Sequence, residues 1–357
     1  MKILIVIYCT LFLSSHFAYA KSKKFIKMDS LVLKTGIDLD LVEADYIKAR
    51  VFGYSFGLDF EDKVYNNLSL FFSTSVFLET GSNEVVSTVS EYEPKEEVTL
   101  DEGGIAYYPT SFLRLRLGAL NQGEYNSPLL IGTSAFAAVE EKFYWNNFYL
   151  KFQQAIPSNQ KLTKRLGAVQ AGTPTFMLET IGLKVGKRSQ LIAELSHYSF
   201  SSLSNNIAET SNVLGNTING SGEATQFDYN FDGYNLMVES YLYYKKWIFI
   251  LGGQYLYNDK APDNRNEGSL LNLGFKRGIY RFAIESFKNE SDTSPAFYNS
   301  KYYGHNDVEG SGIIFGIDNK LLSFSIRYAN YRPLIDKTYR GGTTEVLSFN
   351  LSREFDI

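Results

Sequence analysis

The chain has 357 residues, of which 35 are Lys or Arg, 39 are Asp or Glu, and one is cysteine. The near balance of charge, with no dominant basic patch, argues against nucleic acid as a partner. The single cysteine, Cys9, lies close to the N-terminus, so the rest of the chain carries no disulfide framework, thiolate metal site or thiol nucleophile.

The N-terminus has the plan of a secretory signal peptide. Lys2 precedes an apolar run from Ile3 to Leu13, and small residues ending in Ala-Tyr-Ala lead to Ala20. This run is shorter than the ~20 residues that a membrane-spanning helix needs. We therefore expect cleavage after Ala20, which leaves residues 21–357 as one domain with 34 basic and 39 acidic residues and no N-terminal plug.

Strand patterns follow one another from Leu31 to the C-terminus. Apolar and polar residues alternate in Leu31–Leu41, in Phe52–Phe60 and in Leu68–Leu78. Each run has the length of ~10 residues that a tilted transmembrane strand requires. Lipid tolerates only helices and edgeless sheets, and no apolar run after residue 20 approaches a spanning helix, so a membrane protein of this composition must be a closed barrel. A large secreted β-protein is the alternative.

Short and long connections alternate along the chain, as in bacterial outer-membrane barrels. Tight turns are predicted near Pro109–Ser111, Lys187–Ser189, Lys245–Lys246, Arg277–Gly278 and Asn319–Lys320. The alternation holds only if Ser134–Phe143 is itself a strand that ends in a tight turn. The prediction is then an all-β, transmembrane antiparallel β-barrel of about sixteen strands, with both termini, Trp145 and Trp247 at the periplasmic end.

Two-residue hairpin loops fix which residues face each other. A loop at Arg277–Gly278 pairs Phe275 with Tyr280, a loop at Asn319–Lys320 pairs Ile317 with Leu322, and a loop at Lys245–Lys246 pairs Leu242 with Phe249. Each pairing places aromatic and aliphatic residues on one face, so we expect this face to contact lipid.

The stretch from Val98 to Trp145 carries the main functional signal. In its second strand Arg114 and Arg116 alternate with leucines, which predicts that the arginines point into a water-filled lumen. The preceding strand is expected to place Ala106 opposite Arg114 and Gly104 opposite Arg116, leaving space for a solute. The loop that follows, near residues 123–133, is predicted to fold inward as a constriction. An ordinary antiparallel sheet with one wet face is the alternative for this stretch.

Seven charged residues are candidates for the pore lining, because charges inside a channel set size and ion preference. They are Arg114, Arg116, Glu102, Lys151, Arg281, Glu285 and Arg327. The alternative is that these charges only solvate a wide wall or pair with acids of the loops.

No catalytic constellation is evident, and no cofactor or metal is predicted. Ser196 and His197 are consecutive in a strand and point to opposite faces, so they cannot form a nucleophile–base pair. His197 is expected at the rim of the barrel, and His305 in a solvated loop. The acidic residues do not have the spacing of a calcium loop.

Leu100–Pro128, with DEGGIAYYP followed by LRLRLGALNQGEYNSP, resembles the strand, turn, strand and inward loop of Gram-negative outer-membrane porins, particularly the phosphate-selective porin-like group. The resemblance is specific over about 45 residues and only architectural elsewhere. It implies a sixteen-stranded barrel, often trimeric, for diffusion of small hydrophilic solutes. A phosphate site is not carried over, because residues 123–133 contain no Lys or Arg. The final Asp356-Ile357 also departs from the terminal aromatic usual in the family.

The sequence thus predicts an outer-membrane porin that contacts outer-membrane lipid and lipopolysaccharide and passes small hydrophilic solutes or ions. A closed barrel that acts as a surface protein or adhesin through its long loops is the competing class. A barrel enzyme is disfavoured by the placement of the histidines.

Overall fold

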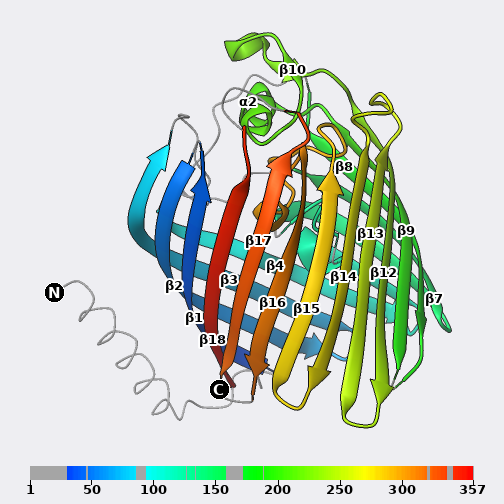
Figure 1. Cartoon of the computed structure of the whole chain (residues 1–357). Helices are drawn as coiled ribbons and strands as arrows, with labels where there is room; N and C mark the ends of the chain where they lie inside the picture. The colour runs from blue at the N-terminus through cyan, green and yellow to red at the C-terminus, as the bar shows by residue number, and fades with distance from the viewer. Residues whose placement is uncertain are drawn as a thin grey trace.

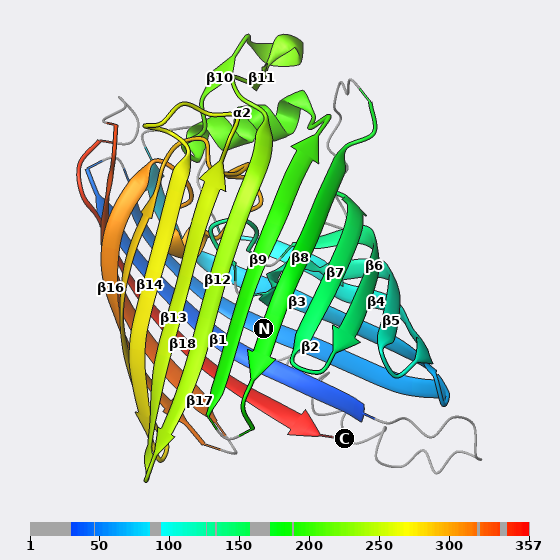
Figure 2. The same cartoon turned by 90° about the vertical axis from the view of Figure 1, so that its right-hand side faces the viewer.

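The structure is a computed structural model that describes residues 30–45, 47–85, 94–125, 127–132, 134–157, 172–187, 189–319, 322–335 and 341–356. The predicted signal peptide lies outside these residues. Within them, sixteen strands close into one antiparallel barrel, shown from two sides in Figures 1 and 2. The predicted all-β barrel and its strand count are therefore confirmed.

The barrel strands run from nine to nineteen residues. Their bounds are β1 Ser30–Ala44, β2 Ile47–Tyr65, β3 Leu68–Val85, β4 Glu96–Thr110, β5 Leu113–Asn121, β6 Ala135–Trp145, β7 Phe148–Ile156, β8 Thr175–Val185, β9 Gln190–Ser201, β12 Phe231–Tyr244, β13 Trp247–Asn258, β14 Glu267–Arg277, β15 Tyr280–Asn289, β16 Val308–Asp318, β17 Ser323–Pro333 and β18 Thr344–Asp356. β2 and β3 exceed the expected ten residues because their pairing continues to Ile47–Val85, past the alternating apolar run.

Each strand pairs with its neighbour in sequence, and β1 pairs with β18 to close the wall. Long loops gather at one end with helix α2 (Asn205–Val213) and the small sheet of β10 (Ile218–Asn219) and β11 (Gln226–Phe227), whereas tight turns and the end of β18 lie at the other, as Figure 1 shows. One connection at the long-loop end is short, between β1 and β2. β6 is a strand, so the predicted alternation holds from there onward.

The two faces of the wall differ in character. Outward-facing apolar side chains are open to the surroundings, with exposed fractions of 53% for Leu117, 60% for Ile181 and 51% for Leu195. Inward-facing neighbours such as Arg116, Thr180 and Glu194 are buried. This is the outside-apolar, inside-polar alternation that a transmembrane barrel requires.

The hairpin at Lys245–Lys246 has the predicted register, with Leu242 opposite Phe249. The prediction for the next hairpin was wrong by two residues, because the turn is Gly278–Ile279 and Phe275 pairs with Phe282. Gly278 has φ 60°, and a two-residue hairpin of the I′ or II′ type needs positive φ at its first turn position. The glycine therefore begins the turn.

The prediction for the last tight hairpin was also wrong by two residues. Ile317 pairs with Phe324 across a four-residue connection, residues 319–322. Asn319 closes this connection, since its Oδ1 accepts a hydrogen bond from the amide of Leu322 at 2.8 Å. A shift of two residues keeps every side chain on its predicted face, because the side-chain period of a strand is two.

Candidate functional site

Two loops fold inward from opposite sides of the barrel. The first follows β5 and includes the 3₁₀ turn η1 (Gln122–Tyr125) and residues 127–132; the second joins β15 to β16 over residues 290–307 and includes η3 (Lys301–Tyr303). Eight strands separate the two loops on either side of the ring. The first is the predicted constriction loop. The second was predicted only as a long external loop.

The two loops meet and form a bridge across the lumen, named the loop bridge below. The amide of Gly132 donates to the carbonyl oxygen of Tyr298 at 2.8 Å, and the amide of Ser300 donates to that of Pro128 at 2.9 Å. The Oγ of Ser294 donates to the carbonyl oxygen of Leu129 at 2.8 Å. Gly132 permits this approach, since a Cβ there would lie 3.3 Å from the Cα of Ser300. The bridge is therefore formed by two backbone–backbone hydrogen bonds and one side-chain donor, the Oγ of Ser294.

Buried asparagines hold the second loop in place. Asn306 is fully buried, and its Nδ2 donates to the carbonyl oxygens of Ser291 at 2.9 Å and Ser294 at 2.7 Å. Asn216, from the loop that carries α2, donates to the same two carbonyl oxygens at 2.7 and 3.0 Å. Buried backbone carbonyls must be paired, and these amides supply the donors.

Apolar packing fixes the bridge against one part of the wall. Leu129, Leu130 and Ile131 of the first loop are buried in a cluster with Phe136 of β6 and Tyr298 of the second loop. The rings of Phe136 and Tyr298 lie edge to face with centroids 5.1 Å apart. The cluster continues to β8, β9 and β13, so this part of the interior is filled with side chains.

Arg114 and Arg116 both lie on the inner face of β5, and both are paired. Arg114 contacts Glu140 at 2.8 Å, and Arg116 contacts Glu102. Arg116 lies opposite Ala106, not opposite Gly104 as predicted, because the turn lies at residues 111–112 and not near Thr110; a bulge at Tyr108–Pro109 then shifts the register by one residue. Proline cannot donate to a ladder and is typical of such bulges. The space expected beside Arg116 is occupied by Glu102 and by the ring of Phe71, 4.6 Å from the guanidinium carbon.

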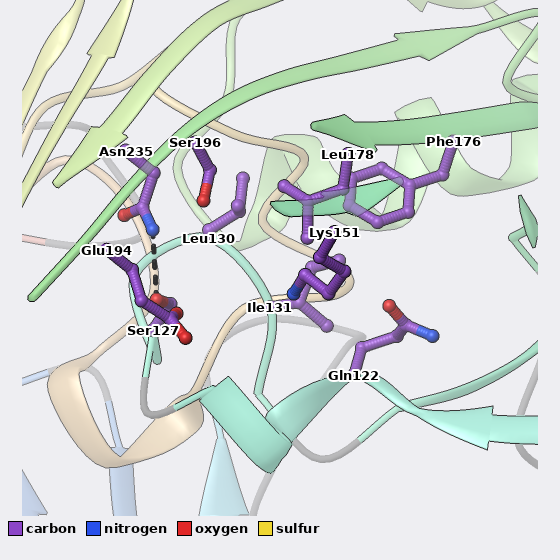
Figure 3. Close-up of a pocket in the computed structure, with 10 residues that line it drawn as sticks. All are labelled: Gln122, Ser127, Leu130, Ile131, Lys151, Phe176, Leu178, Glu194, Ser196 and Asn235. Atoms are coloured by element: carbon purple, nitrogen blue, oxygen red, sulfur yellow. Dashed lines mark hydrogen bonds between the residues drawn. The ribbon is translucent and has the colours of Figure 1, made fainter. Parts of the chain in front are cut away.

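Lys151 points into a small pocket between the wall and the first loop, which Figure 3 shows. The pocket has a volume of about 20 Å³, room for one water molecule, and Gln122, Glu194 and Asn235 also line it. Asn235 Nδ2 donates to the Oγ of Ser127 at 2.9 Å, so the pocket is also an anchor of the first loop.

Glu285 and Arg327 form a fully buried ion pair on β15 and β17. Arg327 Nε donates to Glu285 Oε1 at 2.7 Å. The side chain of Arg327 is 4% exposed and that of Glu285 is 0% exposed. The Arg327 guanidinium also lies over the rings of Tyr302 and Tyr303, at 4.5 and 5.5 Å. Burial raises the pKa of Tyr303 well above its ordinary value, so this loop residue stays neutral. The pair fastens the second loop to the wall.

Arg281 lines a larger cavity of about 200 Å³ beside β12–β16. Other residues of its lining are Glu239, Tyr241, Ile250, Asn272 and Tyr303. Of the seven predicted residues, all face the interior, but they are divided among separate places and do not form one ring. Sequence reasoning did not name Asp40 and Glu239 as lining residues, although alternation places both on the inner face, and it predicted the second loop only as an external loop.

The two histidines have different environments. His197 lies on the outer face near the long-loop end, 38% exposed, and its Nε2 is 3.1 Å from Asp232, in agreement with the predicted rim position. The prediction for His305 was wrong. This residue is buried, and its Nδ1 is 2.7 Å from Asn299 Oδ1, because it is part of the inward loop. Among the described residues, no group of three or more His, Cys, Asp or Glu side chains is placed to hold a metal ion.

A closed sixteen-stranded antiparallel barrel with a polar interior and inward loops is the fold of the outer-membrane porins. OprB of Pseudomonas putida is similar with a TM-score of 0.63 and 12% identity, covering 91% of this chain and 93% of that chain. OmpF of Salmonella typhi has a TM-score of 0.55 and 11% identity, covering 92% and 98%. OccK5 of Pseudomonas aeruginosa has a TM-score of 0.53 and 10% identity, covering 94% and 100%.

At these identities the likeness establishes the fold and no more. No family model matches the sequence, and no curated protein is significantly similar to it. Within the described residues, no helix is long and apolar enough to cross a membrane.

Proposed function

We propose that the protein is a channel of the Gram-negative outer membrane that lets small hydrophilic solutes or ions diffuse passively. The observation that carries this proposal is the opposite polarity of the two faces of the wall. Leu117 and Leu195 are exposed outward, and Arg116, Glu140 and Glu194 are buried inward. Such a wall suits a lipid exterior and a polar interior.

The loop bridge gives the channel its narrow part. Among the described residues it fills the interior beside β6–β9, and space remains beside β12–β16 and beside β1, β17 and β18, where solutes would pass. Secretion by means of residues 1–20, insertion among outer-membrane lipid and lipopolysaccharide, and assembly into trimers belong to the same proposal.

Single-channel conductance of the purified protein in planar bilayers tests the proposal. Discrete steps are expected from the wild type, and removal of the second loop's anchor in Asn306→Ala should increase current noise. A silent wild type would contradict the channel. It would favour a closed barrel that acts as a surface protein, for which the observation is the folded external segment of α2, β10 and β11.

A further inference from the structure

The cavity beside β12–β16 has an arginine at one side and a glutamate at another. Arg281 and Glu239 both line it, three strands apart in the wall. Between them the lining includes Gly252 and Gly253 of β13 beside the side chains of Ile250 and Asn272. At Gly252 a Cβ would meet only the Cβ of Asn272, at 3.6 Å, among the described atoms within 4 Å. The cavity of about 200 Å³ therefore has opposite charges at two sides, and the backbone of Gly252 forms part of its lining.

Arg281 differs from the other predicted arginines in its bonding. Among the described residues it forms no ion pair, and its Nε is buried without a hydrogen-bond partner. The guanidinium lies over Gly316, where a Cβ would be 3.1 Å from Nε, so the glycine makes room for it. The nearby Asp318 already accepts hydrogen bonds from Lys276 at 3.1 Å and Ser323 at 2.9 Å. The guanidinium thus retains donors for a solute.

Glu239 supplies the negative side of the cavity. Its Oε1 accepts a hydrogen bond from the hydroxyl of Tyr241 at 2.5 Å, which fixes the carboxylate near the lining. Ile250 and the ring of Tyr303 add apolar surface. A guanidinium binds a carboxylate through paired N–H donors, and a carboxylate attracts an ammonium group.

We propose that this cavity is a binding station for small zwitterions that carry one carboxylate and one ammonium group. The carboxylate would bind Arg281 and the ammonium group would face Glu239, so that simple anions are repelled from one side and simple cations from the other. This inference rests on the proposed channel and names a class of solute for it.

The test is a titration of single-channel current in planar bilayers with β-alanine, acetate and glycerol. β-Alanine is expected to reduce the wild-type current in a saturable way and more strongly than either control solute. Arg281→Gln should weaken the apparent affinity for β-alanine by about tenfold or more, since one charged hydrogen-bonded contact is lost. Gly252→Leu should abolish the block by filling the cavity.

Arg277→Gln is the matched control. It makes the same substitution at the end of the neighbouring strand β14, where the guanidinium lies 4.9 Å from the ring of Trp247 and does not line the cavity. It should leave the block by β-alanine unchanged. An equal effect of Arg277→Gln and Arg281→Gln would overturn the site in favour of a general charge effect.

The remaining outcomes are also decisive. A conducting wild type that β-alanine blocks no better than glycerol would overturn the binding station and leave the channel intact. Equal block by acetate would overturn the role of Glu239 and the zwitterion class. A wild-type protein that gives no current would contradict the proposed channel function itself.

Discussion

At the scale of single residues, the buried pair of Glu285 and Arg327 shows how charge is kept inside this barrel. Both side chains are removed from water, and each supplies the other's counter-charge. The desolvation of two ions is costly, so such a pair adds little net stability compared with an apolar pair, but loss of one partner leaves a buried charge uncompensated.

Arg327→Met should therefore lower the free energy of unfolding by ~3–5 kcal/mol. The double variant Glu285→Gln/Arg327→Met should recover most of this loss, because no lone charge remains. Urea unfolding in detergent micelles measures the free energy of unfolding of both variants. The folded fraction is followed by the electrophoretic mobility of the folded barrel. Equal destabilisation of the single and the double variant would contradict the explanation.

The turn glycine Gly278 tests the hairpin register at the same scale. A Cβ at this position would meet no described atom within 4 Å, so only its positive φ opposes substitution. Gly278→Val should cost ~1–2 kcal/mol. Gly278→Asn, which tolerates this conformation, should cost clearly less in the same unfolding measurement. Equal costs would point to a turn at other residues.

At the scale of elements, the loop bridge depends on amide side chains that no local pattern reveals. The loop between β15 and β16 is rich in Ser, Asn, Asp and Thr, a composition typical of solvated loops, and alternation stops at its ends. The strands could be predicted because polarity repeats every two residues. The inward course of this loop could not, because Asn216 meets its carbonyls from 75 positions earlier in the chain.

Asn306→Ala should loosen the second loop. The carbonyl oxygens of Ser291 and Ser294 would each keep the donor from Asn216 but lose the one from Asn306, at a net cost of ~0.5–1.5 kcal/mol per hydrogen bond. We expect faster limited proteolysis within residues 290–307. Asn205→Ala is the control, since Asn205 lies in α2 and its hydrogen bond to the carbonyl oxygen of Gly222 is at an exposed site. An unchanged cleavage rate in Asn306→Ala would show that the amide is dispensable.

At the scale of the whole molecule, the outer face decides whether the barrel resides in lipid. Leu195 lies near the middle of β9 and faces outward. Leu195→Arg should destabilise the barrel by ~2–4 kcal/mol in lipid vesicles, whereas Ser201→Arg at the end of the same strand should cost ~0–1 kcal/mol. Reversible unfolding from vesicles gives both values. Equal small losses of stability in the two variants would contradict the placement of Leu195 in the lipid-embedded part of the barrel.

The candidate site was predictable only in part, because its contacts depend on how the whole barrel is assembled. Alternation places Arg114, Lys151, Arg281 and Arg327 on the inner face correctly, but their partners come from other strands and loops. Arg116 was expected opposite Gly104, but the turn lies at residues 111–112 and places it opposite Ala106. Its guanidinium contacts Glu102 and does not border free space. Side-chain pairing depends on register and on loop placement, which single-strand patterns do not fix.

The loop bridge also has a consequence for the order of assembly. The hydrogen bond from Ser294 to Leu129 joins residues 165 positions apart, and the loops that it connects leave opposite sides of the wall. Long-range contacts form late, because the shorter-range strand pairing must first reduce the entropy cost of bringing distant residues together. We expect the two loops to join only when the strands between them are in place. The newly formed barrel would then pass through a wider and more permeable stage before the bridge reduces it to its final bore.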